Sequence, residues 1–264
     1  MSSERVEDAR EAYRKKDLEI SKKAHEQARI KEDIYHKRAQ GEYIGDLVYG
    51  ALDGIVTTFA VVAGATGASL SPGIVLILGF VNLLGDGVAM ALGNYLSSKS
   101  ESEYRAAERA REEWEIKNIP EGEREELKQI YSKKGFEDPL LEQVIDVLTS
   151  DEERWADTMM LEELNIVSEY KSPVKGAVAT FVAFVGVGIV PLLAFVLSFL
   201  QPSLSRSEFQ NSLILTALTI FIVGSARSLV TGKKWYIAGV EMSIVGAIAA
   251  GAAYVVGLLL GRIA

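Results

Sequence analysis

Apolar and polar residues are separated into long blocks along this chain of 264 residues. Charged side chains crowd residues 1–40 and 98–173, whereas residues 44–97 and 174–262 contain few of them. Helices and strands of a soluble domain alternate apolar and polar positions at a regular period, but a helix surrounded by lipid does not need to. The block pattern therefore predicts membrane-spanning segments joined to polar segments outside the bilayer.

Five apolar runs are long enough to cross the hydrocarbon layer, which takes about 20 residues. These runs are 44–65, 72–97, 174–200, 210–230 and 236–260. In a soluble protein of this length, five such runs would leave too little polar surface to keep the protein in solution. We therefore expect an all-α membrane protein with five transmembrane helices and a helical domain inserted between spans two and three.

Lysine and arginine near the span ends predict the orientation, because cytoplasmic loops carry an excess of them. The turn 66–71 has none, and the loop 201–209 has only Arg206. On the opposite side lie Lys37, Arg38, Lys99, Arg105, Lys171, Lys175, Lys233 and Lys234. We therefore expect the N-terminus and residues 98–173 in the cytoplasm and the C-terminus outside. The predicted parts are a charged N-terminal helix in 1–43, spans one and two in 44–97, a cytoplasmic helical metal-binding domain in 98–173, and spans three to five in 174–264.

Composition excludes several classes of function. The net charge of -8 argues against a nucleic-acid partner, because phosphate contacts need a basic surface. The chain has no cysteine, which excludes disulfides, iron–sulfur clusters, thiolate zinc sites and cysteine nucleophiles. No phosphate-binding loop motif occurs, so ATP is disfavoured as an energy source. The first 40 residues have no apolar run, and we expect no cleavable signal peptide.

Polar side chains recur on single faces of the first two spans. Asp46 and Asp53 are seven residues apart in span one, and Asn82, Asp86 and Met90 follow one another at four-residue steps in span two. An ionisable group in hydrocarbon costs about 2.5–3.5 kcal/mol, so this stripe predicts a polar pathway. Carboxylate and thioether ligands together suit Fe²⁺ or Mn²⁺ better than Ca²⁺ or Mg²⁺.

Charged residues near the span ends have a simpler alternative. Asp46 and Glu241 lie near the cytoplasmic interface, where hydration explains them equally well. Arg227 ends span four, and we expect its long side chain to reach the headgroups. In the N-terminal segment, His25, Glu32 and His36 share one helical face. A solvated helix explains that face better than a weak metal site does.

Residues 98–173 predict four helices. The first continues out of span two until Pro120, and the second covers Glu121–Lys134. A third opens at Asp138–Pro139, since proline suits a first helical turn. The fourth covers 151–170, with Ser150 and Glu153 as a capping box.

Two of these helices carry acidic faces, in a segment with 21 acidic and 11 basic residues. On the first helix, the face comprises Glu101, Glu108, Glu112 and Glu115, within about 60° of one another. On the last helix, Glu152, Met159 and Glu163 share a face, with Glu162 adjacent. Packed together, the two faces would form a multinuclear metal site. Solvated helices with ordinary surface ion pairs are the alternative that pattern alone leaves open.

Four stretches resemble the vacuolar iron transporter (VIT) family: YGALDGIVTTFAVVAG (49–64), NLLGDGVAMALGNYLSSKSE (82–101), REEWEIKNIPEGEREELKQIYSKKGF (111–136) and LTSDEERWADTMMLEEL (148–164). The resemblance covers about 44–262. It implies a five-helix homodimer that exchanges Fe²⁺, and often Mn²⁺, for protons. It also implies a cytoplasmic domain that binds metal through glutamates and methionines.

The resemblance assigns roles to particular residues. Asp53 and Met90 match the family's pathway residues. Matching the cytoplasmic ligands are Glu101, Glu112, Glu115, Met159 and Glu163, with Met160 and Glu162 as further candidates. The family commonly has another glutamate where this chain has Tyr104, and Glu108, one turn further on, is a substitute on the same face.

We therefore predict a transporter, not an enzyme, that exports Fe²⁺ (alternatively Mn²⁺ or another divalent transition metal) from the cytoplasm by proton antiport. The metal is the substrate, and no prosthetic group is expected. The expected partners are metal ions, protons, the lipid bilayer and a second copy of the chain. The membrane is the cell membrane in a prokaryote or a vacuolar-type membrane in a eukaryote.

Two alternatives come from other classes. A membrane-anchored di-iron carboxylate oxidase would use Glu-x-x-His motifs, but no histidine follows His36. A metal sensor or buffer would not explain Asp53 and Asp86 inside the spans.

Overall fold

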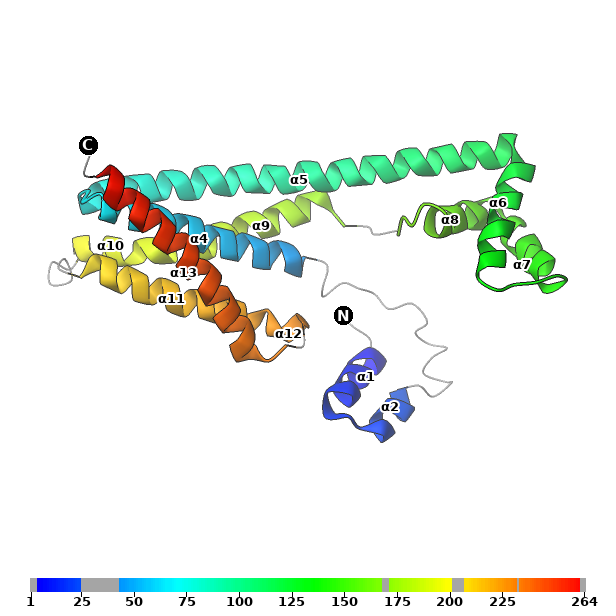
Figure 1. Cartoon of the computed structure of the whole chain (residues 1–264), viewed down its shortest axis with the longest axis horizontal. Coiled ribbons are helices and arrows are strands. Elements are labelled where there is room, and N and C mark those ends of the chain that lie inside the picture. Colours follow the sequence, from blue (N-terminus) through cyan, green and yellow to red (C-terminus); the bar gives the residue numbers. More distant parts are fainter. Residues whose placement is uncertain (1–3, 25–42, 168–170, 201–206, 232, 262–264) are drawn as a thin grey trace. The chain divides into compact units, whose positions relative to one another are not determined.

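The computed structural model describes residues 4–24, 43–167, 171–200, 207–231 and 233–261, and these residues contain helices and no strand. The chain divides into two compact units, residues 1–93 with 174–264 and residues 94–173. One helix, α5 (Pro72–Asn118), carries residues of both units and is unbroken over 47 residues (cyan to green in Figure 1). The predicted histidine face at 25–36 lies outside the described residues.

The first unit contains the apolar helices. They are α4 (Ile44–Gly67), the first part of α5, α9 (Pro173–Gly188), α10 (Val190–Leu200), α11 (Glu208–Ala226), the short α12 (Ser228–Thr231) and α13 (Trp235–Leu260). By length and composition, α4, α5, α11 and α13 can each cross a membrane, and the bent pair α9 and α10 makes a fifth if it is counted as one span. The described helices thus agree with the five predicted spans, and the protein is a multi-pass membrane protein. Helices α4, α11 and α13 lie side by side (Figure 1).

The third span is not the continuous helix that we predicted. It bends by 40° between α9 and α10, at Ile189. Pro191 follows the bend, and proline has no N–H to continue the helical hydrogen bonds of the preceding turn. The Ser212 hydroxyl on α11 donates a hydrogen bond of 2.7 Å to the carbonyl oxygen of Pro191, which ties the start of α10 to its neighbour.

Glycines bring the backbones of α4, α9 and α13 into direct contact. A Cβ on Gly54 would lie 2.3 Å from the carbonyl oxygen of Phe184 on α9. A Cβ on Gly257 of α13 would lie 2.1 Å from the carbonyl oxygen of Gly64 on α4. Small residues permit such close approach of helices in lipid. The apolar core beside these contacts includes Phe59, Val62, Val75, Leu83, Phe184 and Leu192.

At the N-terminus, α1 (Glu4–Lys15) packs against α2 (Leu18–Ala24). Asp17 precedes α2, and its carboxylate accepts hydrogen bonds from the backbone amides of Glu19 and Ile20. This is the usual capping of a helix N-terminus by an aspartate.

The second unit contains the end of α5 and the helices α6 (Pro120–Lys133), α7 (Leu140–Thr149) and α8 (Glu152–Glu162). The predicted continuation of span two into this unit is confirmed, and so is a helix after Pro120. Helix α8 ends earlier than predicted, and its capping residue is Asp151 rather than Ser150. The Asp151 carboxylate accepts a hydrogen bond of 2.8 Å from the amide of Arg154.

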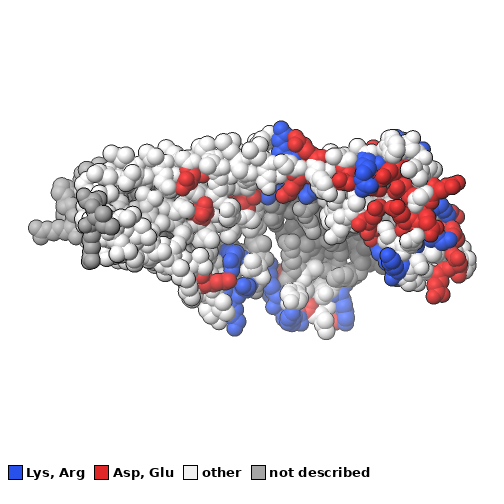
Figure 2. All heavy atoms as spheres, turned by 45° about the horizontal axis from the view of Figure 1, so that its top comes forward, with Lys and Arg blue, Asp and Glu red and all other residues white. Residues whose placement is uncertain are grey.

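A small apolar core holds this second unit together. It comprises Ile116, Leu127, Leu141, Ile145, Trp155, Ala156 and Met159, contributed by all four of its helices. On α6, the Arg124 guanidinium donates to Glu142 at 3.0 Å and to Asp146 at 2.5 Å on α7, and Lys128 also pairs with Glu142. The surface of this unit carries dense acidic and basic side chains, whereas the visible surface of the apolar helices is mostly uncharged (Figure 2).

Candidate metal centre

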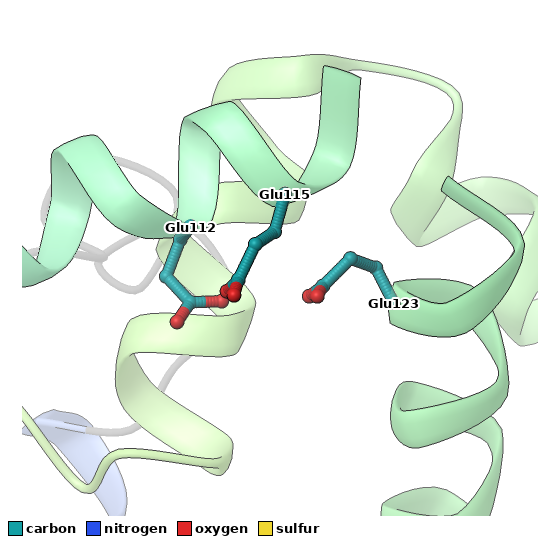
Figure 3. Close-up of side chains that lie close together, drawn as sticks. All are labelled: Glu112, Glu115 and Glu123. Atoms are coloured by element: carbon teal, nitrogen blue, oxygen red, sulfur yellow. The ribbon is translucent and has the colours of Figure 1, made fainter. Parts of the chain in front are cut away.

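Three glutamates converge from two helices in the second unit. Glu112 and Glu115 lie on α5, Glu123 lies on α6, and their side chains point toward one another (Figure 3). One carboxylate oxygen from each residue lies within 4.8 Å of the others. Two oxygens on opposite sides of a metal ion with bonds of about 2.0–2.2 Å are about 4 Å apart. Small side-chain movements therefore bring all three onto one divalent ion.

A second group shares one member with the first. Glu123 and Glu126 on α6 meet Glu163, which caps the C-terminal end of α8, and their oxygens also lie within 4.8 Å of one another. Glu126 and Glu163 are exposed to solvent. The two groups together place five carboxylates from three helices in one cluster, which we call the glutamate cluster.

Burial sets the electrostatics of the glutamate cluster. Glu112 is 0% exposed and Glu123 is 6% exposed. Neither oxygen of Glu112, nor Oε2 of Glu123, accepts a hydrogen bond within the described part of the chain. Desolvation, together with repulsion from the neighbouring carboxylates, raises the pKa of Glu112 and of Glu123 to about 7 in each case. The pKa of Glu163 is raised by the same two causes, desolvation first.

Arg111 is the basic residue beside this cluster. Its guanidinium lies 2.8 Å from Glu115, 2.7 Å from Glu112 and 3.1 Å from Glu108. The nearby positive charge lowers the pKa of Glu112 against the effect of burial, and the three glutamates raise the pKa of Arg111. A metal ion that binds Glu112 and Glu115 therefore competes with this guanidinium for the same oxygens.

The structure brings together part of the predicted ligand set. Glu112, Glu115 and Glu163 belong to the glutamate cluster. Glu108 is linked to the cluster through Arg111. Glu101 lies 3.8 Å from Arg105 and lines a separate open hollow of about 440 Å³, so it stays a predicted ligand.

The predicted ligands of α8 have other surroundings. Met159 is 0% exposed and packs in the apolar core of the unit, and Met160 is 6% exposed. Glu162 forms an ion pair with Lys134. The roles of these three residues as metal ligands remain predictions.

Sequence reasoning missed Glu123 and Glu126. They are three residues apart on α6 and so share a face, but surface glutamates show the same spacing. The available signal was the short connection after Asn118, since Pro120 starts a new helix two residues further on. Only the fold reveals that this face meets Glu112 and Glu115.

The spans contain a second acidic site. Asp53 on α4 is partly buried, and Asp86 lies on α5. Asp86 is exposed on the surface of its helix. Asp46, nearer the start of α4, is 7% exposed.

The other polar residues of the spans lie close to the apolar core. Asn82 is partly buried, and its Nδ2 has no acceptor in the described part of the chain. Met90 packs against the core around Phe184. Arg227 pairs with Glu241 at 2.6 Å, and Lys233 lies 3.5 Å from the same carboxylate, so the reach of Arg227 to the headgroups stays a prediction.

Spanning helices with acidic side chains inside them, joined to a unit that carries the glutamate cluster, define a multi-pass membrane protein equipped to handle metal cations. The model of the VIT family matches residues 44–258, and the chain belongs to this family. Its members are transporters and not enzymes.

Similar proteins span nearly the same length. A vacuolar iron transporter of Toxoplasma gondii is 34% identical over 96% of this chain and 87% of its own length. One of Plasmodium berghei is 32% identical over 98% of both chains. Vacuolar iron transporter 1 of Arabidopsis thaliana is 34% identical over 81% of this chain and 84% of its own. These relatives support transport of metal ions across a membrane as the activity of the chain.

Proposed function

We propose that this protein moves Fe²⁺ out of the cytoplasm in exchange for protons, with Mn²⁺ as a further substrate. The observation that carries the proposal is the presence of two carboxylates, Asp53 on α4 and Asp86 on α5, inside helices apolar enough to span the membrane. A carboxylate in a low-dielectric region is costly when it is ionised, and a cation or a proton relieves that cost. A site that holds either a metal ion or a proton couples the two fluxes.

The glutamate cluster acts as the collector of the metal in this proposal. Its carboxylates offer oxygen ligands, which Fe²⁺ and Mn²⁺ accept, and the predicted orientation puts them on the cytoplasmic side. The relatives named vacuolar iron transporters favour iron as the main substrate. A multi-pass protein of this kind is expected in a cell membrane or a vacuolar-type membrane.

A homodimer is part of the proposal. Asp86 lies within the apolar first part of α5 and is exposed in the single chain. A charged group in contact with lipid is costly, so a second copy of the chain that covers this face would complete the polar pathway.

Transport by the purified protein in liposomes tests the proposal. A pH-sensitive dye and a metal-sensitive dye inside the vesicles would follow protons and metal after addition of Fe²⁺, Mn²⁺, Co²⁺ or Zn²⁺. We expect Fe²⁺ and protons to move in opposite directions, and Asp53→Asn to abolish both fluxes. Glu103→Gln, at an exposed position of α5, is the control that keeps both. Metal flux without proton flux would overturn the antiport mechanism, and full activity of Asp53→Asn would overturn the role of the carboxylate pair.

A further inference from the structure

The connection between the last two spans carries a group of basic and aromatic side chains. Helix α11 ends at Ala226 and α13 begins at Trp235, with the short α12 between them (Figure 1). Both α11 and α13 are apolar enough to cross a membrane, so this connection lies where the two spans leave the hydrocarbon. Its basic residues are Arg227, Lys233 and Lys234.

One carboxylate holds two of these three cations. Oε2 of Glu241, near the start of α13, lies 2.6 Å from the guanidinium of Arg227 and 3.5 Å from Nζ of Lys233. Glu241 carries a single negative charge and so cannot neutralise both partners. Lys234 is exposed and forms no ion pair with any residue that the structure describes. Three cations thus share one carboxylate, which leaves two positive charges for a ligand.

Aromatic rings lie beside these basic residues. The side chain of Trp235 is 59% exposed and that of Tyr236 is 46% exposed. The Trp235 ring meets Phe221 of α11 edge-on with centroids 6.0 Å apart, and it meets Tyr236 in the same manner at 5.9 Å. Tryptophan and tyrosine are enriched where a membrane protein meets the lipid headgroups, because their rings are partly apolar and partly polar. The contact with Phe221 fixes Trp235 between the two spans.

Lysines at the end of a span are common because they orient the chain, and alone they indicate no ligand. Here one carboxylate fixes two cations, a third cation is left for an outside partner, and an aromatic ring is held beside them. We propose that Arg227, Lys233 and Lys234 together bind the headgroup of an anionic phospholipid, while the exposed ring of Trp235 lies against the upper part of its acyl chains. This lipid site is separate from the residues that handle metal.

The chemistry of the headgroup explains why the lipid is anionic. Phosphate oxygens accept strong hydrogen bonds from guanidinium and ammonium groups. Phosphatidylglycerol brings this phosphate with no positive charge, whereas phosphatidylcholine also brings a quaternary ammonium that the same three cations repel. Free phosphate has no acyl chain and so gains nothing from Trp235. The site therefore favours an anionic lipid over both.

Quenching of tryptophan fluorescence by brominated acyl chains tests the assignment on the full-length protein in vesicles. Two preparations contain the same mixture of phosphatidylcholine and phosphatidylglycerol, with bromine on one lipid or on the other. The chain has three tryptophans, and Trp114 and Trp155 belong to the second unit. Their background is measured in Trp235→Phe. Brominated phosphatidylglycerol should quench Trp235 more than its mole fraction in the vesicle predicts.

Charge variants should move this excess quenching in opposite directions. A basic residue near a membrane surface contributes about fivefold in affinity for anionic lipid, so Lys233→Gln combined with Lys234→Gln should lower the relative affinity at least about tenfold. Arginine at both positions keeps the charges and should keep the excess. Glu241→Gln removes the carboxylate that competes for Arg227 and Lys233, and should raise the relative affinity about fivefold.

Lys22→Gln combined with Lys23→Gln is the matched control. These lysines are also adjacent and exposed, but they lie on α2, and their substitution changes the net charge by the same amount. This variant should keep the excess quenching, and circular dichroism checks that each variant is folded. The lipid site is overturned if both brominated lipids quench Trp235 equally in the wild type, or if the variants at 233 and 234 behave like those at 22 and 23.

Inorganic phosphate separates the lipid from a free anion. At equal ionic strength, phosphate and chloride in the buffer should lower the excess quenching to the same small extent, through screening. If phosphate alone abolishes the excess, the site binds free phosphate and the lipid assignment is rejected. The assay contains no metal ion, so its outcome does not depend on the proposed transport of Fe²⁺.

Discussion

Burial of Glu112 makes the stability of the second unit depend on pH. Its carboxyl group is 0% exposed, and its pKa is raised from 4.5 to about 7. In the unfolded chain this carboxyl group ionises near its ordinary pKa of 4.5. Between pH 4.5 and about pH 7, the folded chain therefore holds a proton that the unfolded chain has released. The stability that this group contributes is complete below about pH 4.5 and is lost as the pH rises to about 7. The shift corresponds to about 3 kcal/mol.

Hydrogen exchange of the metal-free, full-length protein measures this effect locally. We expect burial of Glu112 alone to lower the protection of α6 and α8 amides, corrected for intrinsic exchange rates, by about a hundredfold between pH 5 and pH 8, and burial of Glu123 to add a fall of similar size. Glu112→Gln should therefore remove about half of the total fall on a logarithmic scale, since Glu123 keeps its own raised pKa. Adding Mn²⁺ at pH 8 should restore protection in the wild type, because an ion that binds only the folded state stabilises it.

Glu113→Gln provides the control for the pH experiment. Glu113 is the neighbour of Glu112 in sequence, but it is exposed and pairs with Arg109 at 2.9 Å. Its substitution should leave the pH dependence unchanged. If wild type, Glu112→Gln and Glu113→Gln show the same dependence, burial of Glu112 is not the cause and the electrostatic reasoning fails.

Three further predictions concern charge and packing. Arg111→Gln should tighten Mn²⁺ binding about tenfold, measured by calorimetry, because it removes a cation that competes for Glu112 and Glu115. Arg109→Gln, whose arginine pairs with Asp157 instead, should change the affinity little, and equal effects of the two variants would refute competition between Arg111 and the metal. Gly54→Ala should lower the melting temperature in detergent by several degrees, because its Cβ would meet a backbone carbonyl of α9, whereas Gly45→Ala has open space and should not. Ser212→Ala should cost about 1 kcal/mol of unfolding free energy, and an unchanged denaturation midpoint would contradict the role of its hydrogen bond.

The pattern of apolar and polar residues predicted those helices whose extent is set by the bilayer thickness or by residues nearby in the sequence. The apolar runs predicted the spans because their length is set by the bilayer, and α5 continues because no proline occurs between Pro72 and Pro120. The capping box was misplaced by one residue, since Ser150 and Asp151 are both good caps and only the backbone geometry distinguishes them. The break after Gly188 was missed because Pro191 lies in a run that is otherwise apolar throughout.

The metal centre could be predicted only in part. Glu112 and Glu115 share a helical face, which periodicity reveals, and periodicity also placed Glu163 on an acidic face of the last helix. The places of Glu123 and Glu126 depend on the direction that α6 takes after Pro120, which is tertiary structure and leaves no periodic signal. The raised pKa of Glu123 exists only once the helices are packed, because burial and the neighbouring carboxylates cause it.

The glycine contacts of the first unit have a consequence for motion. Where backbone meets backbone, as at Gly54 with α9 and at Gly257 with α4, helices cannot slide or rotate past each other without collision. Helix α5 instead touches its neighbours through flexible side chains, since the closest atoms to a Cβ on Gly79 belong to the Leu192 side chain. We therefore expect α4, α9 and α13 to move as one rigid body during transport. The opening and closing of the route past Asp53 and Asp86 would then come from displacement of α5 against that body.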